Sequence, residues 1–165
     1  MMLLPFKEAI VLENEKVQLR PLLQEDLPHL IHFAITEPKL WQYSLLDAGG
    51  EENMKKYLNN ALSKRDQEDS YPFIVFDKLS NQYAGSTRFY DYQKTHNTVQ
   101  LGYTWYGKAF HGSHVNKNCK FLLLEYAFES LQVERVEFRA DNTNKRSIAA
   151  MKSIGCTVEG VLRSN

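Results

Sequence analysis

The spacing of hydrophobic residues predicts strands and helices in the first part of the chain. Apolar residues at helical spacing, with polar residues opposite, predict amphipathic helices over 27–34 and 51–62. Alternating or continuous apolar runs predict four strands, over 17–22, 71–77, 82–91 and 98–106. Polar turns separate the last three of these strands, so we expect a meander with helices packed against it.

The stretch from Trp105 to Leu131 organises the second half of the chain. A strand ends in an irregular loop of small and polar residues, and a helix predicted over 117–131 follows. This helix carries apolar residues nearly all round, which is typical of a helix inside a domain, and its Lys117 and Lys120 are expected to be surface charges. A loop that leads into a buried helix presents unpaired backbone N–H groups, an arrangement that suits an anion such as a pyrophosphate.

A strand over 133–140, a helix over 144–154 and a short strand over 157–162 complete the pattern. Asn144 is the expected N-cap of that helix and Gly155 its C-terminal stop. The strands on either side of the central helix should be parallel, because a helix connects them. We therefore predict an α+β fold of three layers, with a mixed, mostly antiparallel sheet and about four helices.

Glycines inside two neighbouring strands are a further signal. Gly85 and Gly102 stand within the strands predicted over 82–91 and 98–106. An internal strand glycine marks a bulge or a close approach of another backbone or a ligand, or it relieves local twist. The pair points to a cleft between these strands.

Length and charge narrow the class of protein. The 165 residues are expected to form one domain, 1–165, with twenty basic and twenty acidic residues. Zero net charge gives no global argument for binding nucleic acid or an anionic membrane, so we expect neither as a partner. The N-terminus lacks the features of a signal peptide, and no apolar run approaches a membrane span, so we expect a cytoplasmic protein.

Cysteine and histidine usage indicates neither a disulfide nor a metal site. Cys119 and Cys156 do not form a CxxC pair, and reduced core residues are the simplest interpretation. The five histidines have no carboxylate or thiol at a useful zinc spacing. We predict no metal.

Several short motifs, taken together and in order, resemble the GNAT acetyltransferase superfamily, particularly its branch of ribosomal-protein alanine N-acetyltransferases (RimJ/RimL-like). The motifs are Leu19-Arg20-Pro21-Leu22, Gly85-Ser86-Thr87-Arg88, Leu101-Gly102-Tyr103-Thr104-Trp105, Tyr126-Ala127-Phe128-Glu129, Arg135-Val136-Glu137, Asn144-x-x-Ser147, Ile154-Gly155 and Glu159-Gly160-Val161-Leu162-Arg163. The resemblance covers nearly the whole chain. Each motif is weak alone, and their common order makes the resemblance specific.

This resemblance implies a transferase that uses acetyl-CoA as co-substrate to acetylate a primary amine, either a protein N-terminus or a small molecule. It implies a splayed strand pair, around 101–105 and 135–140, in which amine and thioester meet. The cofactor-binding residues that it implies are Tyr103, Thr104, Trp105, His111, Gly112, Ser113, His114, Val115, Asn116, Asn144 and Ser147.

The chain departs from the family pattern at the reacting groups. The loop over 111–116, which the resemblance implies holds the pyrophosphate, is called the cradle loop here. In it, the family has Gln or Arg at the position of His111, Gly at the position of His114, and Gly or Ala at the position of Asn116. Met151 stands where many members have a tyrosine that protonates the leaving thiolate, and Ser147 is the natural substitute as the catalytic residue. Gln100 stands where the family has a glutamate base; Asp91, Tyr90 and His111 are candidate replacements, and a water wire or a neutral amine would also serve.

The acceptor side is the least constrained by the sequence. The substrate residues that we predict are Trp41, Tyr43, Arg88 and Tyr90, although core packing explains the two aromatics at 41 and 43 equally well. Asn144 and Ser147 also fit a plain N-cap and first-turn pair. Lys145 and Arg146 would either reach the 3′-phosphate of coenzyme A or be solvated.

Two other interpretations stay open. The changes at Gln100, Met151 and the loop fit a non-catalytic acyl-CoA-binding or sensing module, and a structural domain without cofactor is a third possibility. Family members usually continue past the Glu-Gly-x-Leu-Arg segment to a strand that closes the sheet. We therefore expect this domain to lack that final strand, or a partner chain, for example in a homodimer, to supply it.

Overall fold

The computed structural model describes residues 3–163, which form one mixed sheet with helices on both faces. The sheet has six strands in the order β1-β2-β3-β4-β5-β6. They are β1 (Leu12–Glu13), β2 (Val17–Pro21), β3 (Ser70–Asp77), β4 (Gln82–Gln93), β5 (Thr98–Tyr106) and β6 (Arg135–Glu137). All neighbouring strands are antiparallel except β5 and β6, which are parallel.

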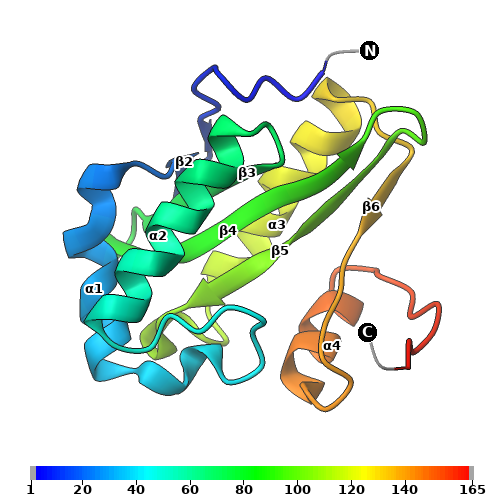
Figure 1. The fold of residues 1–165 in the computed structure, drawn as a ribbon. Coiled ribbons are helices and arrows are strands. Elements are labelled where there is room, and N and C mark those ends of the chain that lie inside the picture. The colour runs from blue at the N-terminus through cyan, green and yellow to red at the C-terminus, as the bar shows by residue number, and fades with distance from the viewer. Residues whose placement is uncertain (1–2, 164–165) are drawn as a thin grey trace.

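Helices cover both faces of the sheet, so the fold has three layers, as the sequence predicts (Figure 1). The α-helices that the structure describes are α1 (Leu27–Thr36), α2 (Glu51–Asp66), α3 (His114–Glu125) and α4 (Lys145–Lys152). In Figure 1, α1 and α2 lie in front of the sheet and α3 lies behind it, while α4 lies beside β6. The α+β fold with a mostly antiparallel sheet is confirmed.

The core explains why β3 and α2 were predictable. β3 is apolar along its length, with Tyr71, Phe73, Ile74 and Val75 fully buried between the two helical layers. α2 turns Met54, Tyr57, Leu58 and Ala61 inward, has acidic residues in its first turn and basic residues in its last turn, and so also complements the helix dipole.

Three predicted boundaries in the second half are wrong. α3 begins at His114 rather than Lys117, because Ser113 caps it, and a π-helical turn (Tyr126–Ser130) replaces its predicted last turn. β6 has three residues where the alternating pattern predicts a strand over 133–140. The segment 138–143 pairs with no described strand, so its alternation produces no ladder.

The strand predicted over 157–162 does not form in the described part of the chain. Residues 157–163 have no regular secondary structure, and most of them are exposed. A strand needs a neighbour for its backbone hydrogen bonds, and β6 is the outermost strand of the described sheet. Within the described part of the chain, the polar side-chain contact of this segment is the ion pair between Glu159 and Arg135 of β6.

Both predicted strand glycines mark close approaches. A Cβ on Gly85 would lie 2.0 Å from the carbonyl oxygen of Trp105, so only glycine fits between β4 and β5 there. A Cβ on Gly102 would lie 2.9 Å from Cε1 of Tyr90. Next to Gly102, β5 has one residue more than β4 between the Arg88–Gly102 and Ser86–Trp105 pairs, which defines a β-bulge.

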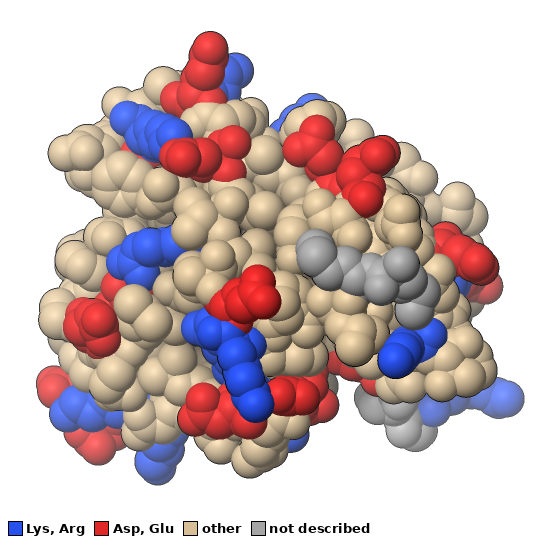
Figure 2. Space-filling model, turned by 90° about the horizontal axis from the view of Figure 1, so that it is seen from above, with Lys and Arg blue, Asp and Glu red and all other residues tan. Residues whose placement is uncertain are grey.

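The surface carries charges of both signs. Figure 2 shows acidic and basic side chains interspersed on one face of the molecule.

Among residues 3–163, no helix is long and apolar enough to cross a membrane, and we find no cluster of three or more potential metal ligands.

Candidate active site

The parallel strands β5 and β6 separate after three residue pairs. The last pair is Gln100 with Glu137, and β5 then continues for six residues with no described strand on that side. Tyr103 lies in this unpaired stretch with a φ of 50°, a left-handed conformation that bends β5 at the bulge. The splay expected around 101–105 is therefore present, and Tyr103, Thr104 and Trp105 lie along it.

The loop after β5 leads into the N-terminus of α3. A 3-10 turn (Lys108–Phe110) is followed by Gly112, which has a φ of +68° and no atom within 4 Å of an added Cβ. Glycine is thus favoured here by its backbone conformation and not by lack of space. His114 and Asn116 lie in the first turn of α3 and have no positive φ, so these positions do not require glycine.

Three of the five backbone N–H groups predicted to hold a pyrophosphate make no hydrogen bond among the described residues. The N–H of Ser113 donates to the carbonyl of Phe110 (3.3 Å), and the N–H of Val115 donates to the Ser113 hydroxyl (3.2 Å). The N–H groups of Gly112, His114 and Asn116 have no such partner. They lie at a helix N-terminus, where the dipole also favours an anion.

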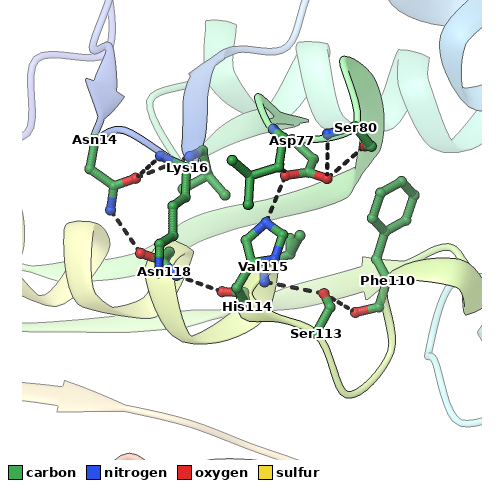
Figure 3. Close-up of polar contacts among 11 residues, drawn as sticks. Asn14, Lys16, Asp77, Ser80, Phe110, Ser113, His114, Val115 and Asn118 are labelled. Atoms are coloured by element: carbon green, nitrogen blue, oxygen red, sulfur yellow. Dashed lines mark hydrogen bonds and ion pairs between the residues drawn. The ribbon is translucent and has the colours of Figure 1, made fainter.

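The ring of His114 faces the sheet (Figure 3). Its Nε2 lies 2.7 Å from Oδ1 of Asp77, the buried last residue of β3. Burial raises the pKa of the Asp77 carboxyl, but hydrogen bonds from Ser80 and His114 outweigh burial and leave that pKa below its usual value. This carboxylate therefore anchors the first turn of α3.

A second contact fixes the same turn of α3 to the β1–β2 hairpin (Figure 3). The Asn118 side chain donates to the carbonyl of His114 (2.8 Å) and accepts from Asn14 (2.9 Å). The sequence alone did not indicate Asp77, Asn14 or Asn118 as residues of this site. Only the polar residues themselves, within or beside apolar segments, could have indicated them.

His111 joins the cradle loop to α4. Its Nδ1 lies 2.9 Å from a guanidinium nitrogen of Arg146, and its Nε2 lies 2.8 Å from the carbonyl oxygen of Tyr106. Arginine can only donate, so Nδ1 accepts and the Nε2–H donates to the carbonyl. Both ring nitrogens are thus engaged, which argues against His111 as a base.

Asn144 caps α4 as predicted. Its side-chain oxygen accepts a hydrogen bond from the N–H of Ser147 (3.1 Å). The Ser147 hydroxyl makes no hydrogen bond among the described residues, and Met151 lies one turn further along the same helix. No residue of α4 is buried.

Gln100 brings a carboxylate to the place where the family base is expected. Its Nε2 donates to Oδ2 of Asp91 (2.6 Å), and Asp91 lies in a second bulge, on β4, with a φ of 48°. The other side-chain atom of Gln100, Oε1, is buried without a hydrogen-bond partner in the described structure. Of the three candidate bases, Asp91 is the only carboxylate, and its partner Gln100 belongs to the last β5–β6 pair.

Arg88 is the largest fully buried side chain and has no counter-ion among the described residues. Its guanidinium lies between two tyrosine rings, with its central carbon 4.0 Å from the Tyr103 ring centroid and 5.2 Å from that of Tyr57. Cation–π contacts of this kind contribute about 0.5–2 kcal/mol. An unpaired buried charge costs several kcal/mol, so the rings compensate only in part.

The other predicted acceptor residues are only partly brought together. Tyr90 packs edge-on against Tyr103 (5.1 Å between centroids), beside Arg88. Trp41 is buried against Trp105 (4.9 Å), so the core-packing interpretation holds for it, while Tyr43 is 46% exposed. Tyr57 was not predicted as a site residue; its hydroxyl accepts a hydrogen bond from the Trp105 indole (3.3 Å).

Lys120 is buried, and its prediction as a surface charge is wrong. Its Nζ donates to the hydroxyl of Thr104 (2.9 Å) and lies 5.5 Å from the Phe138 ring centroid, between β5 and the segment after β6. Burial lowers the pKa of this ammonium to about 8. The apolar character of α3 on all sides was the signal that a residue in this helix would be buried.

Comparisons with known proteins show the family and the fold of the chain. A family model described as "Acetyltransferase (GNAT) domain" matches residues 16–157. A crystal structure of a putative acetyltransferase from T. thermophilus is 30% identical, with a TM-score of 0.86 over 100% of this chain and 82% of that chain.

Two further matches are more distant. An uncharacterized N-acetyltransferase p20 of Bacillus licheniformis is 26% identical over 160 residues, 92% of this chain and 85% of that protein. The structure of the microcin C7 self-immunity acetyltransferase MccE, in complex with acetyl-CoA and AMP, shares the fold. It is 20% identical, with a TM-score of 0.79 over 92% of this chain and 84% of that chain.

Proposed function

This chain belongs to the GNAT acetyltransferase family and is an acetyl-CoA-dependent acetyltransferase, and we propose that it acetylates a primary amine by direct attack in a ternary complex. The observation that carries the proposal is the splay of β5 from β6, which opens beside the capped N-terminus of α3. In this proposal the acceptor is a small-molecule amine or a peptide N-terminus. The motif resemblance to the ribosomal-protein alanine branch supports the peptide N-terminus as acceptor.

The residues around the α3 N-terminus fit an acyl-CoA. The N–H groups of Gly112, His114 and Asn116 would hold its pyrophosphate, and the unpaired edge of β5 at Tyr103–Trp105 would hold the pantetheine arm. Acetyl-CoA supplies an acetyl group activated as a thioester. Arg146, fixed by His111, would face the phosphates from α4.

The proton transfers are assigned to two side chains of this protein. Asp91, held by Gln100, accepts the proton that the acceptor amine loses before or during attack. Ser147, whose hydroxyl has no described partner, donates a proton to the departing thiolate in place of the family's tyrosine. Amide formation releases coenzyme A as the thiol.

The test is a thiol-release assay with acetyl-CoA and a panel of small amines and peptides with different N-terminal residues. We expect turnover above acetyl-CoA hydrolysis for at least one class of acceptor. Ser147→Ala should lower kcat by about 100-fold while the thermal shift given by acetyl-CoA is retained, since general acid catalysis contributes on that order. The alanine variant keeps the backbone N–H that donates to the Asn144 cap, so we expect α4 to fold as in the wild type.

Lys56→Met is the matched control, because Lys56 is exposed on the outer side of α2. Its turnover should equal that of the wild type. Tight binding of acetyl-CoA with no transfer to any acceptor would instead favour a sensing module, and the absence of a thermal shift would exclude acyl-CoA binding altogether.

A further inference from the structure

The environment of Arg88 is unusual for a buried arginine. The residue is 1% exposed, its Nε and Nη2 atoms have no hydrogen-bond partner, and no ion pair reaches it from the described residues. An arginine side chain stays charged at every physiological pH. The charge therefore persists, while the donors on Nε and Nη2 have no acceptor in the described structure.

The position of Arg88 relates this unmet charge to the splay. Arg88 lies directly opposite Gly102 in the β4–β5 register, next to the bulge and just beyond the last β5–β6 pair. Its guanidinium contacts Tyr57 of α2, so it lies on the face of the sheet that α1 and α2 cover. The neighbouring Thr87 points to the other face, where its hydroxyl bonds to Thr104.

One of the two tyrosines is exposed. Tyr57 is 4% exposed and belongs to the core, whereas Tyr103 is 37% exposed and covers the guanidinium from outside. Tyr103 is therefore the more exposed of the two rings that contact Arg88. The planar fork of donors on the guanidinium matches the two oxygens of a carboxylate.

The charged residues near Tyr90 and Tyr103 show which cations of this region lack an anionic partner. The pKa of Tyr90 is raised, chiefly by burial, and the nearby charge of Arg139 opposes that rise. Asp91 and Glu137 are also close to Tyr90, but Gln100 and Arg135 bind their carboxylates. Lys64 lies near Tyr103 and pairs with the exposed Asp69. Arg139 and Arg88 are thus the cations of this region without a described anionic partner.

We propose that Arg88 binds a carboxylate of the acceptor, so that the acetylated amine belongs to an amino acid or a similar amino-carboxylate. The guanidinium forms a two-pronged ion pair with the carboxylate, and Tyr57 and Tyr103 flank it. The inference rests on the proposed acetyl transfer to an amine. It selects the small-molecule form of the acceptor over the peptide N-terminus, and it adds the second functional group that this molecule must carry.

The experiment compares α-amino acids with their carboxamides, which differ only in the anionic group, and includes O-phosphoethanolamine as an anion of different shape. Binding is measured by thermal shift on protein saturated with coenzyme A, and turnover by thiol release. We expect at least one amino acid to bind ~30-fold or more tightly than its carboxamide, the loss typical when one partner of a buried ion pair is removed.

Variants identify the residue responsible. Arg88→Met should abolish the preference for the carboxylate and leave carboxamide binding and acetyl-CoA affinity within about threefold. Arg88→Lys should retain part of the preference, because lysine keeps the charge without the planar fork. Lys56→Met should bind like the wild type.

The outcomes separate the two proposals. Equal binding of every amino acid and its carboxamide to the wild type would overturn the inference, whether or not the variants fold. Preference for the phosphate compound would overturn the carboxylate as ligand. Selective carboxylate binding that depends on Arg88, but without turnover, would support the anion site and overturn only the acetyl transfer.

Discussion

Two buried cations lie on opposite faces of the same strand pair, and they differ in how the protein accommodates them. Lys120 reaches Thr104 from α3, and Arg88 lies between two tyrosine rings on the side of α1 and α2. Neither has a carboxylate partner among the described residues. Burial lowers the pKa of the lysine to about 8, so this side chain can become neutral by losing a proton. The arginine cannot, and its charge persists.

The difference shows which of the two residues implies a ligand. A lysine with a lowered pKa limits its own cost, because the neutral amine needs only a hydrogen bond such as the one to Thr104. A buried arginine keeps its charge for as long as the protein is folded, so the cost of its burial persists until an anion binds. The unmet arginine therefore carries the inference about the acceptor, while Lys120 is explained by its titration.

The largest expected effect tests the geometry on which both faces depend. Gly85→Val should lower the free energy of unfolding by more than about 3 kcal/mol, because the new Cβ would meet the Trp105 carbonyl at 2.0 Å. Urea unfolding followed by circular dichroism measures it. Gly160→Ala is the control: an added Cβ there has nothing within 4 Å, and stability should change little. Equal stability of the two variants would contradict the close approach of β4 and β5.

The second effect concerns Lys120 and depends on pH. Its pKa is about 8 in the folded protein and near 10.5 when unfolded, so between these values only the unfolded chain holds the proton and stability rises with pH. The stability difference between wild type and Lys120→Met should change by about 3 kcal/mol across this window, in favour of the wild type at high pH.

Denaturant unfolding of both proteins from pH 7.5 to 10.5 provides the measurement. Taking the difference cancels the contribution of every group that Lys120 does not affect. Cys119, whose pKa burial raises to about 12, acts in the opposite direction, and its contribution cancels only in part because Lys120 lowers that pKa. A difference that stays constant with pH would show that Lys120 is not desolvated.

The smallest effect concerns Arg88 and should not depend on pH. Arg88→Met replaces a buried charge by an apolar chain of similar length, and we expect the free energy of unfolding to rise by about 1–3 kcal/mol. The gain should be the same at pH 7 and pH 9, because arginine does not titrate in this range. A loss of stability would mean that the two tyrosine contacts fully compensate the charge.

The sequence predicted most of the fold because its strands and helices have strong, regular patterns. β3, β4, β5 and α2 lie where periodicity places them, and the capped helix at Asn144 is present. The strand over 157–162 failed since strand propensity needs a partner strand, which a local pattern does not reveal. β1, with two residues, is too short for any pattern.

The site was less predictable because it depends on which face each side chain takes. The sequence indicated the cradle loop, the splay and Arg88 as a substrate residue, but not that Arg88 is buried without a partner. From the sequence, Gln100 stands where the family has its glutamate base. The carboxylate of Asp91 contacts Gln100 at the bulge on β4, and a sequence pattern does not reveal that bulge. Lys120 was misjudged since single charges in helices usually lie on the surface.

The bulge at Tyr103 changes which face of the sheet the odd-numbered and even-numbered residues of β5 take. Before it, odd-numbered residues such as Leu101, opposite Phe89, lie on the side of α3. After it, even-numbered residues take that side, since Thr104 meets Lys120 while Trp105 packs against Trp41. The one inserted residue thus reverses which face each later side chain of β5 takes. Deleting it would move the Thr104 hydroxyl to the face of Trp41 and the Trp105 indole to the face of Lys120.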